Sequence, residues 1–287
     1  MTFGDSCDFV LASGVHCHND ATMCGVRCVR GRSGTGLVAV LAGAFALMPA
    51  SQPANAGFLL TEGTYQLIST NSISRFSRGF DARGSLKRSA VFSKTSLDVH
   101  LAYGFSETVT FIADISSERL LPQIVGDPGA ASPWSAMAGP RFQLWRDGPT
   151  IVSAQVMAGA GQATGSSGFV GDARILAGHS FAIGGVPAFV DAQLGYRQGA
   201  PGALSEIRLD ATFGIKPHES WLLLAQLLTA RAMAAQGQPN GLRMKAQISA
   251  VWHVGETWSV QTAAFTTVAG INAAQESGLV LGLWRRF

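Results

Sequence analysis

Residues 206–215 read EIRLDATFGI, and residues 242–252 read LRMKAQISAVW. In both stretches apolar side chains occupy every second position, and mostly polar or small residues fill the positions between them. A period of two places these two sets on opposite faces of an extended strand. Such runs of about ten residues exceed the roughly 5–6 residues of most soluble strands and match strands tilted across a bilayer.

The same alternation recurs along the chain, for example at 97–104 and 190–197, and the segments between the runs differ in length. Short turns are predicted at 104–107, 146–149, 184–187, 216–219 and 254–256. Longer links rich in Gly, Ser, Pro and Ala are predicted at 77–93, 117–135, 160–172, 198–205, 233–241 and 269–276. Short turns at one end and long loops at the other are typical of bacterial outer-membrane barrels.

The predicted strands are 62–76, 94–104, 107–116, 137–146, 150–159, 173–183, 187–197, 206–215, 219–231, 242–253, 257–268 and 277–287. They are even in number and run in a simple up-and-down order. We therefore expect an all-β fold, a transmembrane antiparallel up-and-down β-barrel of about 12 strands, with its short turns and both termini of the barrel chain on the periplasmic side.

The composition agrees with a barrel that has one face toward lipid and one toward an aqueous interior. Of the 287 residues, 14% are charged and 47% are hydrophobic, and the formal net charge is +3. An average globular chain has about 25% charged residues at a similar apolar share. These values exclude a disordered, collagenous or coiled-coil chain and disfavour an ordinary cytosolic enzyme.

The first 56 residues are predicted to be an N-terminal extension followed by a cleaved secretory signal peptide. Arg27, Arg30 and Arg32 precede the apolar run 37–48, and Ala54-Asn55-Ala56 offers a small-residue cleavage site. This order of positive, apolar and small segments is what signal peptidase requires. Cleavage after Ala56 would leave 57–287 as the barrel, and either Met1 or Met23 could be the true start.

All four cysteines lie in this leader, so the predicted mature chain has no disulfide, thiol nucleophile or cysteine metal site. His16, Cys17, His18, Cys24 and Cys28 form a local cluster, but their spacing matches no zinc pattern. No metal site and no cofactor is expected. No later segment has the 18 or so consecutive apolar residues of a membrane-spanning helix, so a soluble periplasmic protein and a barrel remain.

The end of the sequence favours the barrel. Leu279, Leu281 and Leu283 are in phase with the terminal Phe287. A closing strand that ends on an aromatic residue resembles the signature read by the barrel-insertion machinery, which makes that machinery an expected partner. Arg285 departs from the signature, at a position where an arginine can snorkel to the membrane rim. Aromatic residues near strand ends predict one girdle: Tyr103, Phe105, Trp145, Trp221, Trp252, Trp258 and Trp284.

Short motifs in 57–287 resemble Gram-negative outer-membrane barrels, and in particular the porin-like group of the MetA pathway of phenol degradation. The motifs are GTYQLIS at 63–69, FDARG at 80–84 and AYGFSE at 102–107. The resemblance implies an outer-membrane location and passage of solutes, and it carries over no catalytic residues.

If the apolar set faces lipid, the charged and polar set lines the lumen. The predicted lumen-lining residues are Asp98, His100, Asp114, Arg141, Asp191, Arg197, Glu206, Arg208, Asp210, Arg243 and Lys245, together with Gln143, Gln193 and Gln247. A barrel of about 12 strands lies between filled small barrels and open large ones. The expected function is a narrow porin-like channel for small polar or anionic solutes; the alternative is a non-conducting structural or interaction barrel.

The predicted link 77–93 is basic and contains Arg78, Arg83, Lys87 and Arg88. As an extracellular loop it would bind lipopolysaccharide phosphates or attract anionic solutes, and it could equally be a solvated loop without a partner. Nucleic acid is not an expected partner of an exported barrel.

Other classes of protein have weaker support. An outer-membrane hydrolase would need a serine and a histidine on one face, and the candidates His100, His179, His218 and His253 show no such pairing in the strand pattern. An autotransporter would need a passenger segment between the cleavage site and the first strand. A soluble β-sandwich remains the alternative at the level of the fold.

Overall fold

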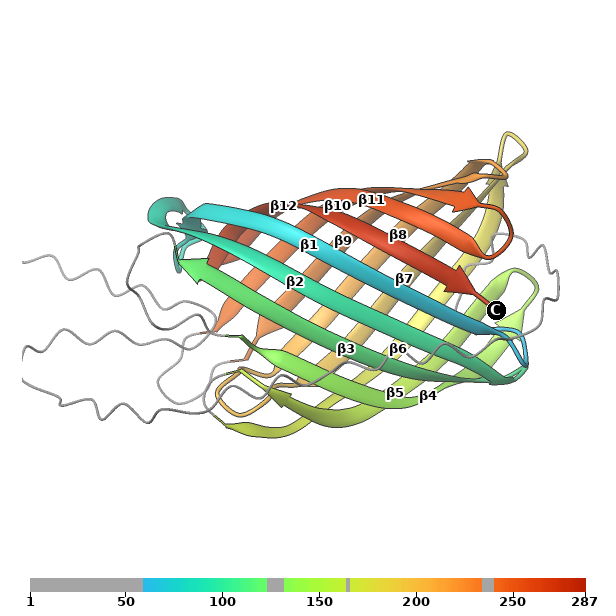
Figure 1. Cartoon of the computed structure of the whole chain (residues 1–287), viewed down its shortest axis with the longest axis horizontal. Helices are drawn as coiled ribbons and strands as arrows, with labels where there is room; N and C mark the ends of the chain where they lie inside the picture. The colour runs from blue at the N-terminus through green and yellow to red at the C-terminus, as the bar shows by residue number, and fades with distance from the viewer. Residues whose placement is uncertain (1–58, 123–131, 164–165, 234–239) are drawn as a thin grey trace, which may run out of the picture.

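The computed structural model describes residues 59–122, 132–163, 166–233 and 240–287. These residues form one closed antiparallel barrel (Figure 1). Its strands are β1 Tyr65–Phe80, β2 Leu86–Ser106, β3 Val109–Pro122, β4 Trp134–Asp147, β5 Thr150–Gln162, β6 Ser167–Ile183, β7 Val186–Gln198, β8 Glu206–His218, β9 Trp221–Ala232, β10 Gly241–Val254, β11 Trp258–Ile271 and β12 Ala273–Arg286. The predicted all-β, twelve-stranded up-and-down barrel is confirmed. The predicted extension and signal peptide at 1–56 lie outside the described residues.

Each strand pairs with its neighbours in the chain, and β1 closes the ring by pairing with β12. At this seam Tyr65 and Phe287 donate backbone N–H groups to each other's carbonyl oxygens, both at 3.1 Å. The start of β1 and the end of β12 therefore lie at the same end of the barrel (Figure 1). Closure therefore removes the two free edges that an open sheet would have. Nowhere in the described segments does a helix have the length and apolar character needed to cross a membrane.

The two faces of the sheet differ in the way the alternation predicts. Large apolar side chains cover the outside: Ile248 is 69% exposed and Leu279 is 63% exposed. The inward-facing Leu176 and Val251 are 0% exposed. Most of the remaining buried inward positions are small or polar, among them Thr110, Ser153, Gln155, Asp172 and Gln261. The barrel thus turns its apolar face outward and encloses most of its polar groups.

Short turns join the strands at the end where β1 starts. They fall at 107–108, 148–149, 184–185, 219–220 and 255–257, each within or beside its predicted segment. Gly184 and Gly185 have φ angles of 58° and 85°. Positive φ at both central residues is the geometry of a type I′ hairpin, which matches the twist of the flanking strands.

Three of the predicted long links are too long. The link 77–93 is a tight hairpin whose turn spans only 81–85, and 269–276 is a turn around Asn272 alone. Most of 160–172 belongs to β5, which ends at Gln162, and to β6, which begins at Ser167. In the first of these, Phe76 is buried and stacks on Phe92 with ring centroids 5.2 Å apart. Apolar side chains therefore face inward here. The alternation of apolar and polar residues is lost, so the sequence pattern does not predict a strand in this region.

Asp81 organises the β1–β2 turn. Its carboxylate accepts backbone N–H bonds from Ser85 and Arg83, both at 2.9 Å. These hydrogen bonds hold the pKa of Asp81 below its usual range, because they stabilise the ionised form. The turn is therefore fixed by a local side chain as well as by the two strands.

Gly104 is predicted to tolerate no side chain. A Cβ at this position would lie 2.1 Å from the carbonyl oxygen of Thr61, because the segment before β1 passes directly over it. We expect Gly104→Ala to lower the free energy of unfolding by about 1–3 kcal/mol, as overpacking does. Urea unfolding followed by tryptophan fluorescence measures this.

The matched control is Gly241→Ala, whose Cβ would meet no atom closer than 3.4 Å. We expect this variant to unfold like the wild type. Equal unfolding midpoints for the two variants would show that the close approach at Gly104 is unimportant.

Candidate functional site

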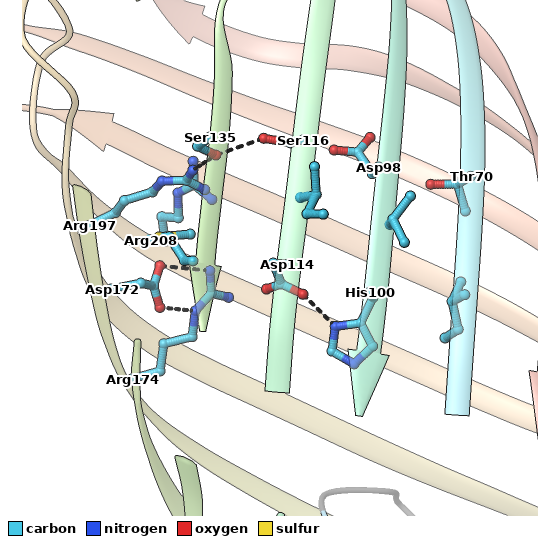
Figure 2. A pocket seen from close by; sticks show the side chains of 14 residues that line it. Thr70, Asp98, His100, Asp114, Ser116, Ser135, Asp172, Arg174, Arg197 and Arg208 are labelled. Carbon is cyan, nitrogen blue, oxygen red and sulfur yellow. Dashed lines mark hydrogen bonds and ion pairs between the residues drawn. The ribbon is translucent and has the colours of Figure 1, made fainter. Parts of the chain in front are cut away.

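The barrel interior contains a cavity of about 250 Å³, which we call the central cavity. Its walls come from β1–β4 on one side and from β6–β8 on the other (Figure 2). The lining residues are Ile68, Thr70, Asp98, Val99, His100, Asp114, Ile115, Ser116, Ser135, Met137, Asp172, Arg174, Arg197 and Arg208. Five of the predicted lumen residues therefore meet here: Asp98, His100, Asp114, Arg197 and Arg208.

Arginines reach into the central cavity from β6, β7 and β8. Arg174 forms a two-pronged ion pair with Asp172 at 2.6 and 3.0 Å and extends to Asp210 at 3.4 Å. Arg208 binds Glu206 at 2.8 Å. Two-pronged pairs of this kind fix the guanidinium plane, so this wall has a defined geometry.

Arg197 differs from the other two arginines. Its guanidinium donates to the Ser135 hydroxyl of β4 at 2.9 Å (Figure 2). Ser135 also shares a hydrogen bond with Ser116 at 2.8 Å. Among the described residues, Arg197 forms no ion pair with a carboxylate.

The opposite wall, on β2 and β3, is acidic. His100 Nδ1 and Asp114 lie 2.6 Å apart. Asp98 accepts a hydrogen bond from the Ser96 hydroxyl at 3.3 Å and, within the described part of the chain, forms no ion pair. Cationic and anionic groups therefore face one cavity from two sides, which sets up an electric field across the lumen.

A second charged cluster, which we call the Glu276 cluster, lies on β2, β10 and β12. Glu276 is 7% exposed, accepts from Lys94 at 3.0 Å and Lys245 at 2.5 Å, and receives the Ser74 hydroxyl at 2.6 Å. Lys94 is the first residue of the predicted strand 94–104, beside the predicted basic link, and its side chain lies inside the barrel. Among the remaining predicted lumen residues, Arg243 pairs with Glu206 at 3.3 Å, Arg141 binds Gln155, and Asp191 is 7% exposed.

Sequence reasoning missed several interior residues, namely Lys94, Glu118, Asp172, Arg174 and Glu276. The alternation along each strand could have identified them, because they lie at every second position, in phase with other inward-facing residues of the same strand. Some of their ion pairs, such as Lys94–Glu276 and Arg174–Asp210, join strands that are not adjacent, and the alternation contains no information on these.

One part of the interior is apolar. Leu60, just before β1, packs against a cluster made of Ala102, Ile112, Met137, Met157, Val170 and Ala200. The backbone N–H of Leu60 donates to the inward hydroxyl of Thr110 at 3.0 Å. Apolar side chains therefore fill one side of the lumen, while charged and polar side chains line the rest.

The predicted basic loop does not exist as a loop. Arg78 lies on β1 opposite Arg88 on β2, Lys87 follows Leu86 on β2, and only Arg83 lies in the turn. Lys87 is 3.9 Å from Asp81, and its side chain is 60% exposed. The basic residues thus gather on a protruding hairpin at the barrel end opposite the short turns.

The expectation that no histidine shares a face with a serine is wrong. His253 Nδ1 lies 2.8 Å from Ser259 Oγ, on neighbouring strands. The charges that act on His253 are those of Lys216 and Arg286, both of which would oppose an imidazolium. His179 faces outward, near the short-turn end, and its partner is Thr150 at 2.8 Å.

The end of β12 carries a stacked cation. The Arg285 guanidinium lies over the Trp258 ring at 4.8 Å and over the Phe287 ring at 4.4 Å. Such contacts stabilise a cation beside apolar surface. Trp284, predicted to belong to the girdle, faces inward instead and donates to Gln261 at 3.0 Å.

In the described part of the chain, no group of three or more His, Cys, Asp or Glu side chains could hold a metal ion.

No protein-family model matches the chain, and no curated protein matches it in sequence. Among solved structures, it is similar to the COG4313 outer membrane channel from Pseudomonas putida F1, with 12% identity, a TM-score of 0.62, and coverage of 83% of this chain and 100% of that one. This likeness supports the barrel fold.

Two looser likenesses are the beta domain of the Bordetella autotransporter BrkA and the P. putida toluene transporter TodX. The first has 12% identity and a TM-score of 0.48, and it covers 79% of this chain and 99% of that one. The second has 9% identity and a TM-score of 0.44, and it covers 79% and 91%. These scores are too low to identify a shared architecture.

We expect Glu276→Gln to destabilise the barrel. The change removes the carboxylate that compensates Lys94 and Lys245, and breaking a buried ion pair on one side costs about 3–5 kcal/mol. Urea unfolding would record the loss. Lys87→Gln, which removes an exposed charge, is the control and is expected to change stability by less than about 1 kcal/mol. Equal effects of the two variants would contradict a structural role for the Glu276 cluster.

Proposed function

We propose that this protein is a Gram-negative outer-membrane β-barrel that forms a narrow channel for passive passage of small polar solutes. The observation that carries the proposal is a closed barrel with an apolar exterior and a charged interior that encloses the central cavity. The finer assignment to the MetA-pathway porin-like group is part of the same proposal and rests on the short motifs described above.

The exterior supports insertion into a membrane. A closed barrel satisfies all of its strand hydrogen bonds internally, which a bilayer demands of any β structure that spans it. Exposed outward side chains such as Leu97, Ile115 and Leu281 are large and apolar along the strands. Outward aromatics also gather at the short-turn end, where Phe105, Trp145 and Trp221 lie. Aromatic rings at that level are typical of a membrane interface.

Location and partners follow from the membrane proposal. We place the short turns in the periplasm and the β1–β2 hairpin outside the cell. The basic residues on that hairpin would bind lipopolysaccharide phosphates, and Phe287 would serve as part of the signal for the barrel-insertion machinery. Export would use the leader at 1–56, with cleavage after Ala56. Outer-membrane lipid surrounds the barrel in this proposal, and neither a cofactor nor nucleic acid takes part.

The interior supports a narrow path. Twelve strands enclose less space than the 16–18 strands of open porins, and charged side chains from several strands occupy much of it. A solute small enough for the central cavity would replace part of its hydration shell with hydroxyl, carboxylate and guanidinium groups. The channel named among the similar structures is consistent with this, although that likeness extends to the fold alone.

A specific observation favours the alternative of a non-conducting barrel. Leu60 packs against an apolar cluster inside the lumen, and several ion pairs join non-adjacent strands. If these groups leave no continuous path, the barrel would serve as a structural or interaction element of the membrane. Conductance separates the two functions.

We expect the purified barrel in planar lipid bilayers to show discrete single-channel events. Thr70→Trp should reduce the conductance severalfold, because residue 70 lines the central cavity. Its control is Ser69→Trp, the adjacent residue on the opposite face of β1, which should conduct like the wild type. The absence of channel events in the wild type would refute the proposed channel.

Membrane insertion has its own test. Folded outer-membrane barrels resist SDS until heated, so unheated and boiled samples should migrate differently on a gel. We also expect extraction from membranes to require detergent. Extraction in plain buffer, with identical migration before and after boiling, would favour the soluble sandwich-like alternative.

A further inference from the structure

The central cavity contains two charges of opposite sign that lack an ion partner among the described residues. Arg197 binds the Ser135 hydroxyl, and Asp98 binds the Ser96 hydroxyl. The other acidic and arginine groups in the lining have side-chain partners: Arg174 pairs with Asp172, Arg208 pairs with Glu206, and Asp114 lies 2.6 Å from His100 Nδ1. Asp98 is exposed and Arg197 is half-buried, so both charges are accessible to a ligand that enters the cavity.

The two groups lie on different walls. Figure 2 shows Arg197 entering from the side of β6–β8, while Asp98 lies on β2 across from it. A solute with only a negative charge would face Asp98, and one with only a positive charge would face the three arginines. A solute that carries both charges can pair with both walls.

We infer that the central cavity binds a small zwitterionic solute of the amino-acid class, with its carboxylate on Arg197 and its ammonium group on Asp98. A guanidinium binds a carboxylate through paired N–H donors, and a carboxylate accepts ammonium protons. The hydroxyls of Thr70, Ser116 and Ser135 line the same space and supply further hydrogen bonds.

The size of the cavity agrees with this class. At about 250 Å³ it is smaller than the roughly 300–1,000 Å³ of pockets that hold drug-sized molecules. A short amino acid fits this range better than a peptide or an oligosaccharide does. The inference deepens the proposed function, and it depends on the proposed channel only for transport, because binding requires no open path.

Equilibrium dialysis of the purified full barrel in detergent tests binding directly. The probe is labelled L-alanine, and the comparisons are propionate and propylamine, which each carry one of its two charges. We expect alanine to bind more tightly than either comparison. Arg197→Gln and Asp98→Asn should each weaken alanine binding by about tenfold, equal to about 1.4 kcal/mol.

Matched controls separate the site from general charge effects. Arg231→Gln and Asp147→Asn change exposed charges outside the cavity and should leave alanine binding unchanged. Arg197→Lys keeps the charge and should restore part of the affinity lost in Arg197→Gln, provided each variant keeps its heat-modifiable migration. If Arg197→Gln fails to fold, alanine binding by Asp98→Asn, on the opposite wall, is the test of the zwitterion site.

Two results would overturn the inference: alanine binding no tighter than propionate, or wild-type affinity in Asp98→Asn. Liposome swelling with erythritol and alanine then distinguishes this failure from failure of the channel. Erythritol entry without alanine binding would support the channel and refute the zwitterion site. Alanine binding without entry of either solute would support the site and refute the channel.

Discussion

One constraint governs this molecule: a single sheet must present an apolar face outward and enclose a polar one. Each strand meets this demand by alternation, so Ile248 and Leu279 lie outside while Asp172 and Gln261 lie inside. The same division explains a composition with 47% hydrophobic and only 14% charged residues. Ring closure completes it, because an open edge would expose unpaired backbone groups beside the apolar exterior.

Some of the charged residues inside the barrel form ion pairs that link strands which are not adjacent. The Glu276 cluster ties β2 and β10 to β12, and Arg174 ties β6 to β8. These contacts skip one strand each, so they brace the ring across its interior rather than along its wall. Ions held in this way have little freedom, which gives the interior a fixed pattern of charge instead of a uniform polar lining.

The sequence predicted the number of strands, their direction and most of the inward residues, because a period of two determines which face a residue occupies. It failed where a strand departs from that rule. The β1–β2 hairpin, in which the buried Phe76 stacks on Phe92, was predicted to be a loop, and Trp284 faces inward at the rim. Partners such as His253 and Ser259 depend on the register between strands, which alternation within a strand does not specify.

The seam between β1 and β12 has a consequence for folding. Tyr65 and Phe287 lie more than two hundred positions apart in the chain, yet they share two backbone hydrogen bonds. All other strand pairs are local hairpins and can form as the chain collapses, whereas this pair requires the whole sheet to curl first. Contacts of such high sequence separation are slow to form. Assembly should therefore pass through an open, twelve-stranded sheet whose two free edges must be protected until they meet.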